Sequence, residues 1–186
     1  DSARIVYQND TGRWLLGFPL TTTQFYLATG QTTISRQSSA EYEAATGLVT
    51  RKTAFPNLND QQKQVTAYTY DAFGNITQQD LTAWNGTQNE TRTNKATYES
   101  TGRFALTRTN ALNQTIGATY NVNLGLKLTE TDPNNLTATY EYDGFGRLTQ
   151  TIEANGTQTA QFHRRCANDT CPPYAVYFTQ INRTDA

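Results

Sequence analysis

The sequence predicts an all-β protein, an antiparallel meander of hairpins in one long sheet, and three observations lead to this prediction. Hydrophobic residues make up 36% of the chain and charged residues only 17%, so Thr, Asn and Gln supply much of the remainder. Thr and Tyr suit a pleated surface that is packed on one face and wet on the other. A tyrosine-led motif recurs along the chain, and glycine-rich turn signals separate short stretches of alternating character. No convincing amphipathic helix competes with this prediction.

The repeated motif is clearest in two copies. Residues 70–77 read YDAFGNIT and residues 142–149 read YDGFGRLT. Weaker copies keep an aromatic residue, a glycine and a following apolar residue, and they begin at Tyr42, Tyr98 and Tyr120. The lead tyrosines at 42, 70, 98, 120 and 142 are therefore 28, 28, 22 and 22 residues apart, and a decayed sixth copy begins at Phe162. A period in this range predicts a repeat architecture built from one supersecondary unit.

Each unit is expected to be a strand, a tight turn, a strand and a second tight turn. Tyr140 and Tyr142 occupy alternate positions, and Leu148 and Ile152 are expected to share one face of the following strand. Residues 143–146 (DGFG) supply the first turn.

Asn-Gly pairs at 85–86 and 155–156 and the segment 132–135 (DPNN) supply further turns between strands. From about Ser39 to Phe162 the chain should hold roughly ten to twelve strands of ordinary length. Residues 1–38 should add strands before the repeats, and residues 163–186 a cysteine-containing insert and further strands, within a single domain.

The motif residues are predicted to be structural. A tyrosine can bury its ring on a sheet face while its hydroxyl reaches water or a backbone group. An aspartate at the strand end can accept a hydrogen bond from the turn backbone two residues later, and glycine can adopt a positive φ. The residues assigned to this motif are Tyr70, Asp71, Gly74, Tyr98, Gly102, Tyr120, Gly125, Tyr142, Asp143 and Gly146.

Catalysis is the less favoured interpretation of the same residues. Asp71, Asp143, Glu99 and Glu141 could act as paired carboxylates of a glycosidase, but Ala44 and Asn121 interrupt the series. No nucleophile elbow or phosphate-binding loop is present. The only histidine, His163, is expected to be a solvated strand end. We therefore expect neither enzymatic activity nor a cofactor.

The two cysteines, Cys166 and Cys171, leave three interpretations open. They could be ordinary thiols, a short disulfide of an oxidising compartment, or part of a metal site. A zinc site would need four ligands, and His163 beside two thiols falls short of that number. We favour the disulfide.

Charge and hydropathy narrow the possible partners. The net charge is −1, from 15 basic and 16 acidic residues. No basic stripe is present, so nucleic acid is an unexpected partner. No apolar run approaches the roughly 20 residues of a spanning helix. No signal peptide is visible and Met is absent, so we expect an excised fragment or a processed product.

The copies at residues 70–77 and 142–149 resemble the RHS/YD-repeat family, whose signature is Tyr-Asp followed by Gly, Arg or Asn, an apolar residue and Thr. Residues 6–10 and 14–19 resemble the segment that precedes the repeats in bacterial members. Residues 166–177 resemble a piece found between repeats in proteins related to the B component of insecticidal toxin complexes. More distantly, the repeats are similar to those of animal teneurins, which act in adhesion.

The resemblance implies a curved or spiralling sheet that forms part of a hollow shell around a toxin or effector. It implies a secreted or cell-surface parent protein, the remainder of which would be the main partner. The weaker copies have lost the Asp of the motif, and nothing in the chain matches the self-cleaving segment or the toxic tail of the family.

A binding module is the alternative function. Tyr-rich sheet faces can stack sugar rings, and Tyr68 and Trp84 are the candidate aromatics for a glycan or a receptor if they face outward. The exposed sheet edges are expected to allow self-association.

Overall fold

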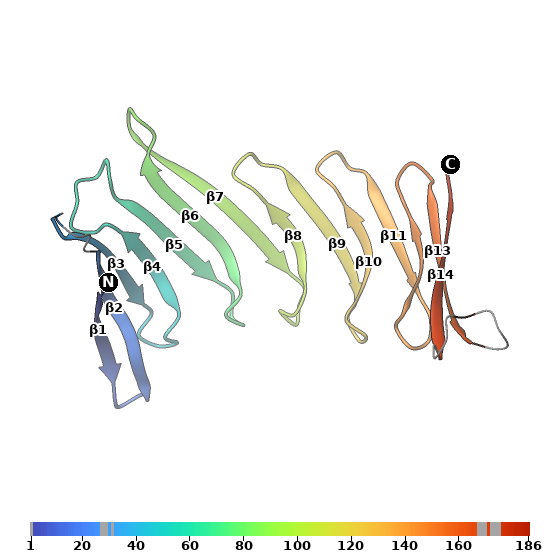
Figure 1. Ribbon diagram of the computed structural model, residues 1–186, viewed down its shortest axis with the longest axis horizontal. Coiled ribbons are helices and arrows are strands. Elements are labelled where there is room, and N and C mark those ends of the chain that lie inside the picture. Colours follow the sequence, from blue (N-terminus) through green and yellow to red (C-terminus); the bar gives the residue numbers. More distant parts are fainter. Residues whose placement is uncertain (1, 27–29, 31, 167–170, 172–175) are drawn as a thin grey trace. The chain divides into compact units, whose positions relative to one another are not determined.

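The computed structural model describes residues 2–26, 30, 32–166, 171 and 176–186. These residues form fourteen strands and no helix. The strands follow one another in sequence order, β1 to β14, in one open sheet, and every described pair of neighbours is antiparallel (Figure 1). The prediction of an all-β antiparallel meander is confirmed. Eleven strands, β3 to β13, overlap residues 39–162, within the expected ten to twelve.

The chain divides into two compact units, residues 1–96 and 97–186. The strands of the first unit are β1 (Ser2–Asp10), β2 (Leu15–Tyr26), β3 (Ile34–Tyr42), β4 (Val49–Ala54), β5 (Gln64–Tyr70), β6 (Ile76–Trp84) and most of β7 (Asn89–Tyr98). Those of the second unit are β8 (Ala105–Thr109), β9 (Thr115–Asn121), β10 (Leu126–Thr131), β11 (Thr137–Tyr142), β12 (Leu148–Ile152), β13 (Gln158–Arg165) and β14 (Tyr177–Thr184).

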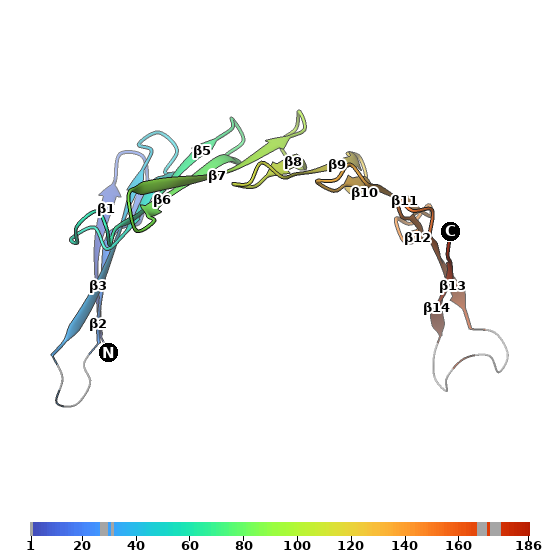
Figure 2. The same ribbon diagram turned by 90° about the horizontal axis from the view of Figure 1, so that it is seen from above.

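Each unit is a single layer of strands, as the view in Figure 2 shows. Among the described residues no hydrophobic side chain is fully buried, and the buried polar side chain is that of Thr157. Large apolar side chains such as Trp14 and Phe145 are 83% and 88% exposed. Cross-strand contacts within the layer therefore hold each unit together, because no second layer packs on the described strands.

The two faces of the sheet carry different side chains. Residues directly opposite one another in an antiparallel pair share a face. By this rule the lead tyrosines lie on one face of each unit, which we call the tyrosine face. The other face, which we call the threonine face, carries pairs of threonine hydroxyls at 2.6–2.8 Å from one another across neighbouring strands, namely Thr82–Thr91, Thr97–Thr107, Thr109–Thr115, Thr119–Thr129 and Thr131–Thr137.

A β-bulge follows the turn at the same place in five repeats. In the copy led by Tyr142, this tyrosine pairs with Leu148, but Glu141 pairs with Gln150, so Thr149 is the extra residue. Equivalent register shifts leave out Leu20, Thr50, Thr77 and Leu128. Each of these residues lies three positions after a glycine of positive φ, so the bulge is part of the repeat.

The bulge corrects one prediction. Leu148 and Ile152 were expected to share a face because they are four residues apart in a strand. Leu148 lies opposite Tyr142 on the tyrosine face, whereas Ile152 lies opposite Thr139 on the threonine face. The extra residue between them reverses the alternation, and simple period-two counting does not detect it.

Candidate functional site

The turn after four of the five lead tyrosines is fixed by an acidic or amide side chain that accepts hydrogen bonds from the backbone. In the copy led by Tyr142 the Asp143 Oδ1 atom accepts hydrogen bonds from the backbone N–H groups of Phe145 and Arg147, at 2.9 and 3.0 Å. Asp71 does the same with Phe73 and Asn75, both at 2.9 Å. The hydrogen bond to the residue two positions later is the one the sequence predicts for this turn.

Glu99 replaces the aspartate in the third copy. Its carboxylate accepts hydrogen bonds from the backbone of Thr101 and Arg103, at 2.7 and 2.8 Å. The hydrogen bond from the Thr101 hydroxyl, followed by that from the Thr101 backbone, lowers the pKa of Glu99 to about 2. The longer Glu side chain therefore accepts from the same turn positions as Asp does. Comparing the repeats by sequence did not reveal this, because the Asp of the motif is absent here.

The strict-motif aspartates also titrate below their ordinary range. The backbone N–H of Arg147 is the main cause of the lowered pKa of Asp143, assisted by the Arg147 side chain. Partial desolvation acts to raise the pKa of Asp71, but hydrogen bonds from Asn75, Phe73 and Gly74 together outweigh it and lower the pKa. These carboxylates are held ionised by turn groups, an environment opposite to that of a proton-donating catalytic acid.

The turn glycines have a second role besides their backbone conformation. Gly47 and Gly146 have φ values of 73° and 77°. A Cβ atom on Gly47 would lie 2.9 Å from Phe18 Cζ, and one on Gly146 would lie 3.7 Å from Leu126 Cδ1. In both cases the neighbour is an apolar side chain of the preceding repeat, one position after the positive-φ glycine of that repeat. The same holds for Gly74 beside Leu48, and Gly125 likewise lies beside an apolar side chain of the preceding repeat, Phe104.

The lead tyrosines join each repeat to the one before it. The hydroxyl of Tyr70 donates to the carbonyl of Val49 at 2.7 Å, and that of Tyr142 donates to the carbonyl of Lys127 at 2.7 Å. Tyr42 does the same with the carbonyl of Pro19 at 3.0 Å. Each acceptor lies two residues after a glycine of positive φ, so the contact is a property of the repeat.

The rings of the lead tyrosines also contact the preceding repeat. Tyr42 packs edge to face on Phe18, with ring centroids 4.8 Å apart, and Tyr120 stacks on Phe104 at 4.9 Å. All five lead tyrosines, including Tyr98, are half-buried.

Two members of this series were not identified from the sequence, and the first of them is Tyr7. It pairs with Pro19 as Tyr42 pairs with Val49, so the hairpin of β1 and β2 is a further repeat, in which both strands continue beyond this pair to Asp10 and Leu15. The signal for it was the Gly-aromatic-Pro of Gly17 to Pro19, two residues before a threonine run.

The second is His163, which takes the lead place in the last repeat. Its Nε2 donates to the carbonyl of Leu148 at 3.0 Å, and its Nδ1 lies 3.0 Å from the hydroxyl of Thr179. The expected solvated strand end is therefore wrong: the ring is half-buried and both nitrogens are bonded. The expected lead residue Phe162 is its exposed neighbour on the other face.

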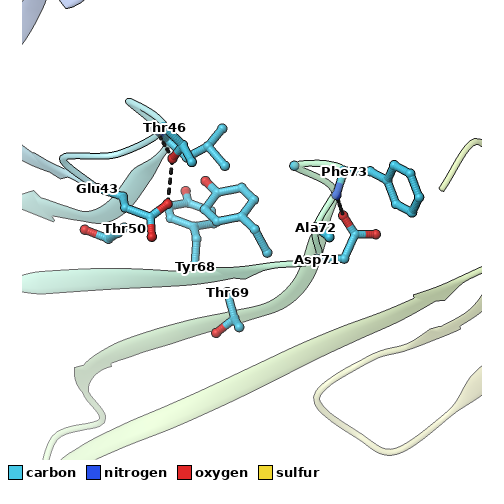
Figure 3. Close-up of a pocket in the computed structure, with 11 residues that line it drawn as sticks. Glu43, Thr46, Thr50, Tyr68, Thr69, Asp71, Ala72 and Phe73 are labelled. Carbon is cyan, nitrogen blue, oxygen red and sulfur yellow. Dashed lines mark hydrogen bonds between the residues drawn. The ribbon is translucent and has the colours of Figure 1, made fainter. Parts of the chain in front are cut away.

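A shallow groove on the tyrosine face of the first unit brings several of these groups together. It has a volume of about 580 Å³ and is lined by Tyr68, Tyr70, Glu43 and Asp71, among others. Figure 3 shows the Tyr68 ring beside Glu43, while Thr69 points to the opposite side of the strand. The Tyr68 and Tyr70 rings stack at 6.4 Å, and the Lys52 ammonium lies 6.0 Å from the Tyr68 ring centroid.

The second candidate aromatic does not belong to this groove. Tyr68 pairs with Gln79 on the tyrosine face. Trp84 lies five residues after Gln79 in β6, with no bulge between them, so it lies on the threonine face. Both aromatic side chains are half-buried. The two proposed ligand-facing aromatics therefore lie on opposite faces of the sheet.

The two cysteines lie between β13 and β14. The Sγ atoms of Cys166 and Cys171 are joined in a disulfide, with Cα atoms 5.8 Å apart. Residues 167–170, which this bridge encloses, and residues 172–175 of the expected insert lie outside the described residues.

Neither a metal site nor a spanning helix is seen in the described part of the chain. No group of three or more His, Cys, Asp or Glu side chains is placed there to hold a metal ion. Over the same residues, no helix has the length and apolar content required to cross a membrane.

Comparisons with known proteins bear on the repeats. The chain is similar in structure to a chain of the Photorhabdus luminescens Tc holotoxin pore, with 14% identity and a TM-score of 0.29. The matched region covers 80% of the present chain but only 11% of that chain. The comparison with curated proteins finds no match.

A family model also matches directly. Residues 124–158 match the RHS Repeat family model. The matched segment includes the second strict copy of the tyrosine-led motif, its bulge and the Asn-Gly turn that follows. The chain thus carries an RHS repeat, and the resemblance to the RHS/YD-repeat family expected from the sequence is confirmed there.

Proposed function

We propose that the chain is a structural wall segment of a larger RHS-repeat polypeptide and has no catalytic role. The single observation that carries this proposal is the single-layered sheet: an RHS repeat in which no described apolar side chain is fully buried. A sheet of this kind depends on neighbouring parts of a polypeptide to cover its edges and faces.

The wall is proposed to belong to a shell that encloses or presents a toxin or effector, in a secreted or surface-displayed parent. The family resemblance implies such a shell. The disulfide between Cys166 and Cys171 supports an oxidising compartment, because such bonds persist outside the cytosol.

The carboxylates of the motif support a non-catalytic role. Asp71, Glu99 and Asp143 all bond to backbone N–H groups of their own turns. Their pKa values are lowered by hydrogen bonds from side chains and backbone N–H groups of the turns, whereas a general acid needs a raised pKa.

The test is limited proteolysis of a parent polypeptide that contains this segment. Gly146→Val should open the wall by forbidding the turn and make an enclosed segment cleavable, whereas the neighbouring Gly144→Val should leave it protected. A Cβ atom on Gly144 would have no other atom within 4 Å, and the φ of this glycine lies outside the left-handed region. Equal cleavage of both variants and the wild type would contradict the proposal.

A carbohydrate-binding role is the second candidate, and the groove beside Tyr68 favours it. A half-exposed aromatic platform with an adjacent carboxylate, Glu43, and a cation, Lys52, offers the stacking surface and hydrogen-bonding groups that sugars use. Because this groove is shallow, the proposed ligand is a glycan displayed on a surface.

Glycan-array binding by two variants distinguishes the faces. A signal from the tyrosine face should be abolished by Tyr68→Ala and retained by Trp84→Ala, because the two side chains lie on opposite faces. Loss of signal with Trp84→Ala alone would move the site to the threonine face. No signal from the wild type would remove this second candidate and leave the structural role.

A further inference from the structure

The same four residues, NGTQ, occur in the connections of two hairpins. They occupy residues 85–88, between β6 and β7, and residues 155–158, which lead from β12 into β13. Asparagine followed by glycine is prone to deamidation, because glycine has no side chain that would hinder attack by its backbone nitrogen. Since the two sequences are identical, any difference in their reactivity must come largely from the fold.

Deamidation is a reaction of the asparagine side chain with the backbone of the next residue. The backbone nitrogen of the glycine loses its proton and attacks Cγ of the asparagine. As the N–Cγ bond forms, the Cγ–Nδ2 bond breaks, and the side-chain nitrogen leaves with a proton as ammonia. Water then opens the resulting succinimide at one of its two carbonyl groups and leaves aspartate or isoaspartate. The reaction therefore requires no reactant other than water.

The attacking nitrogen is in a different state in the two turns. The backbone N–H of Gly156 donates to the carbonyl of Glu153 at 2.9 Å, whereas no described residue accepts from the backbone N–H of Gly86. A Cβ atom on Gly86 would have no other atom within 4 Å, whereas one on Gly156 would lie 3.1 Å from Ala186 Cβ. The nitrogen of Gly86 can therefore lose its proton and approach Cγ without breaking a hydrogen bond of the folded chain.

The side-chain oxygen also differs between the two asparagines. Asn85 Oδ1 accepts hydrogen bonds from the backbone N–H groups of Thr87 and Gln88, both at 2.9 Å. Asn155 Oδ1 accepts from the backbone N–H of Thr157 at 3.0 Å. Negative charge develops on this oxygen during the attack, and donors that already point at it stabilise that charge. Among the described residues, Asn85 has two such donors and Asn155 has one.

We propose that Asn85 is a site of spontaneous deamidation and that the turn around Asn155 protects the second NGTQ segment. Both asparagine side chains are exposed, so access of water does not distinguish them. The hydrogen bond of Gly156 alone should slow the reaction at Asn155 by about two- to tenfold. The additional donor to Asn85 Oδ1 acts in the same direction.

The product should weaken the end of the β6–β7 hairpin. Asn85 Nδ2 donates to Glu90 Oε2 at 3.1 Å, and deamidation to aspartate replaces this donor with a carboxylate oxygen. Two negative charges then face one another, although Arg92, 3.2 Å from the other oxygen of Glu90, offsets part of the repulsion. Isoaspartate in addition adds one carbon to the backbone of the turn. Modification at Asn85 should therefore loosen the pairing of β6 with β7 near this turn.

Peptide mapping by mass spectrometry of the incubated full chain tests the proposal. In the folded chain, aspartate and isoaspartate should accumulate faster at Asn85 than at Asn155. In denaturant, where both turns are lost, the two rates should become similar. Asn85→Ser cannot form a succinimide but keeps an oxygen that can accept from the turn, so it should abolish modification at this position and leave the rate at Asn155 unchanged.

Two further variants measure the consequence of the reaction. Asn85→Asp should lower the melting temperature more than Asn155→Asp does, because Asn155 Nδ2 donates to no described residue. Combining Asn85→Asp with Glu90→Gln should reduce the loss. Equal rates at the two sites in the folded chain, faster reaction at Asn155, or a rate difference that persists in denaturant would overturn the proposed site. A variant Asn85→Asp as stable as the wild type would overturn its effect on the hairpin.

Discussion

At the scale of single residues, the turns after Tyr70, Tyr98, Tyr120 and Tyr142 each combine a carboxylate or amide that accepts from the backbone with a glycine of positive φ. The glycine needs its backbone conformation, and it also needs to lack a side chain because an apolar side chain of the preceding repeat packs onto it. Gly47 shows this most clearly, since a Cβ there would lie 2.9 Å from Phe18 Cζ. The motif therefore encodes the contact between turns as well as the turn itself.

The effect of Gly146 can be measured directly. Gly146→Val should lower the free energy of unfolding by more than about 1 kcal/mol, because a β-branched residue is strained at φ 77°. Gly144→Val, in the same turn, should cost clearly less. Chemical denaturation of the two variants checks this, and an unchanged midpoint for Gly146→Val would refute the role given to its backbone.

The turn held by Glu99 predicts a pH dependence. The folded-state pKa of about 2 lies below the ordinary value of 4.5, so the ionised carboxylate stabilises the folded chain above about pH 4.5. This contribution should be lost as the pH falls from about 4.5 through about 2, where the unfolded and then the folded state binds the proton.

Melting temperatures of the wild type and Glu99→Gln across this pH range provide the measurement. The advantage of the wild type should shrink as the pH falls. Glu141→Gln, which removes a carboxylate from a strand and not from a turn, controls for the change in net charge. A wild-type advantage that is constant with pH would contradict the assignment.

At the scale of the element, the repeat is a hairpin with a fixed bulge. Strands, turns and the period could be predicted from the sequence because lead tyrosines, glycines and Asn-Gly pairs are local signals. The bulge at Thr149 could not be predicted from the sequence. Its only effect on the sequence pattern is that the alternation of inward and outward residues reverses between Leu148 and Ile152, which looks like ordinary sequence variation. The lead position of His163 was not identified for a similar reason, since its imidazole replaces the phenol of a tyrosine in the same contact.

The backward hydrogen bond of the lead tyrosine can be tested within the second unit. Tyr142→Phe removes the donor to the Lys127 carbonyl and should cost about 0.5–1.5 kcal/mol of unfolding free energy. Tyr120→Phe is the matched control, because its ring stacks on Phe104 and no described residue bonds its hydroxyl. Equal losses for both variants would show that the ring, and not the hydroxyl, joins the repeats.

At the scale of the whole molecule, stability comes from a single layer of strands in which little apolar surface is removed from water. The open antiparallel sheet was predictable from the composition, since Thr and Tyr in alternating strands imply sheet faces that stay partly exposed to water. The groove beside Tyr68 was not, because it depends on Glu43 from the preceding turn, which sequence spacing does not place beside Tyr68.

The exposed layer predicts an unusual calorimetric result. Unfolding exposes little new apolar surface when no described apolar side chain is fully buried. The heat-capacity change should therefore lie below the usual range of about 12–15 cal/mol/K per residue. Differential scanning calorimetry at a concentration where the chain is monomeric measures it, and a value within the usual range would indicate a buried core.

The paired threonines affect how the threonine face is hydrated. The mean hydropathy of −0.68 gives every threonine the same value, whether or not its hydroxyl is bonded within the chain. In five threonine pairs, however, the two hydroxyls are hydrogen-bonded to one another across neighbouring strands. One hydroxyl of each pair therefore donates its hydrogen to the other hydroxyl and not to water. Fewer donors remain for hydration than the composition implies, and this face should shed its first water shell more readily than an unpaired row of serines would.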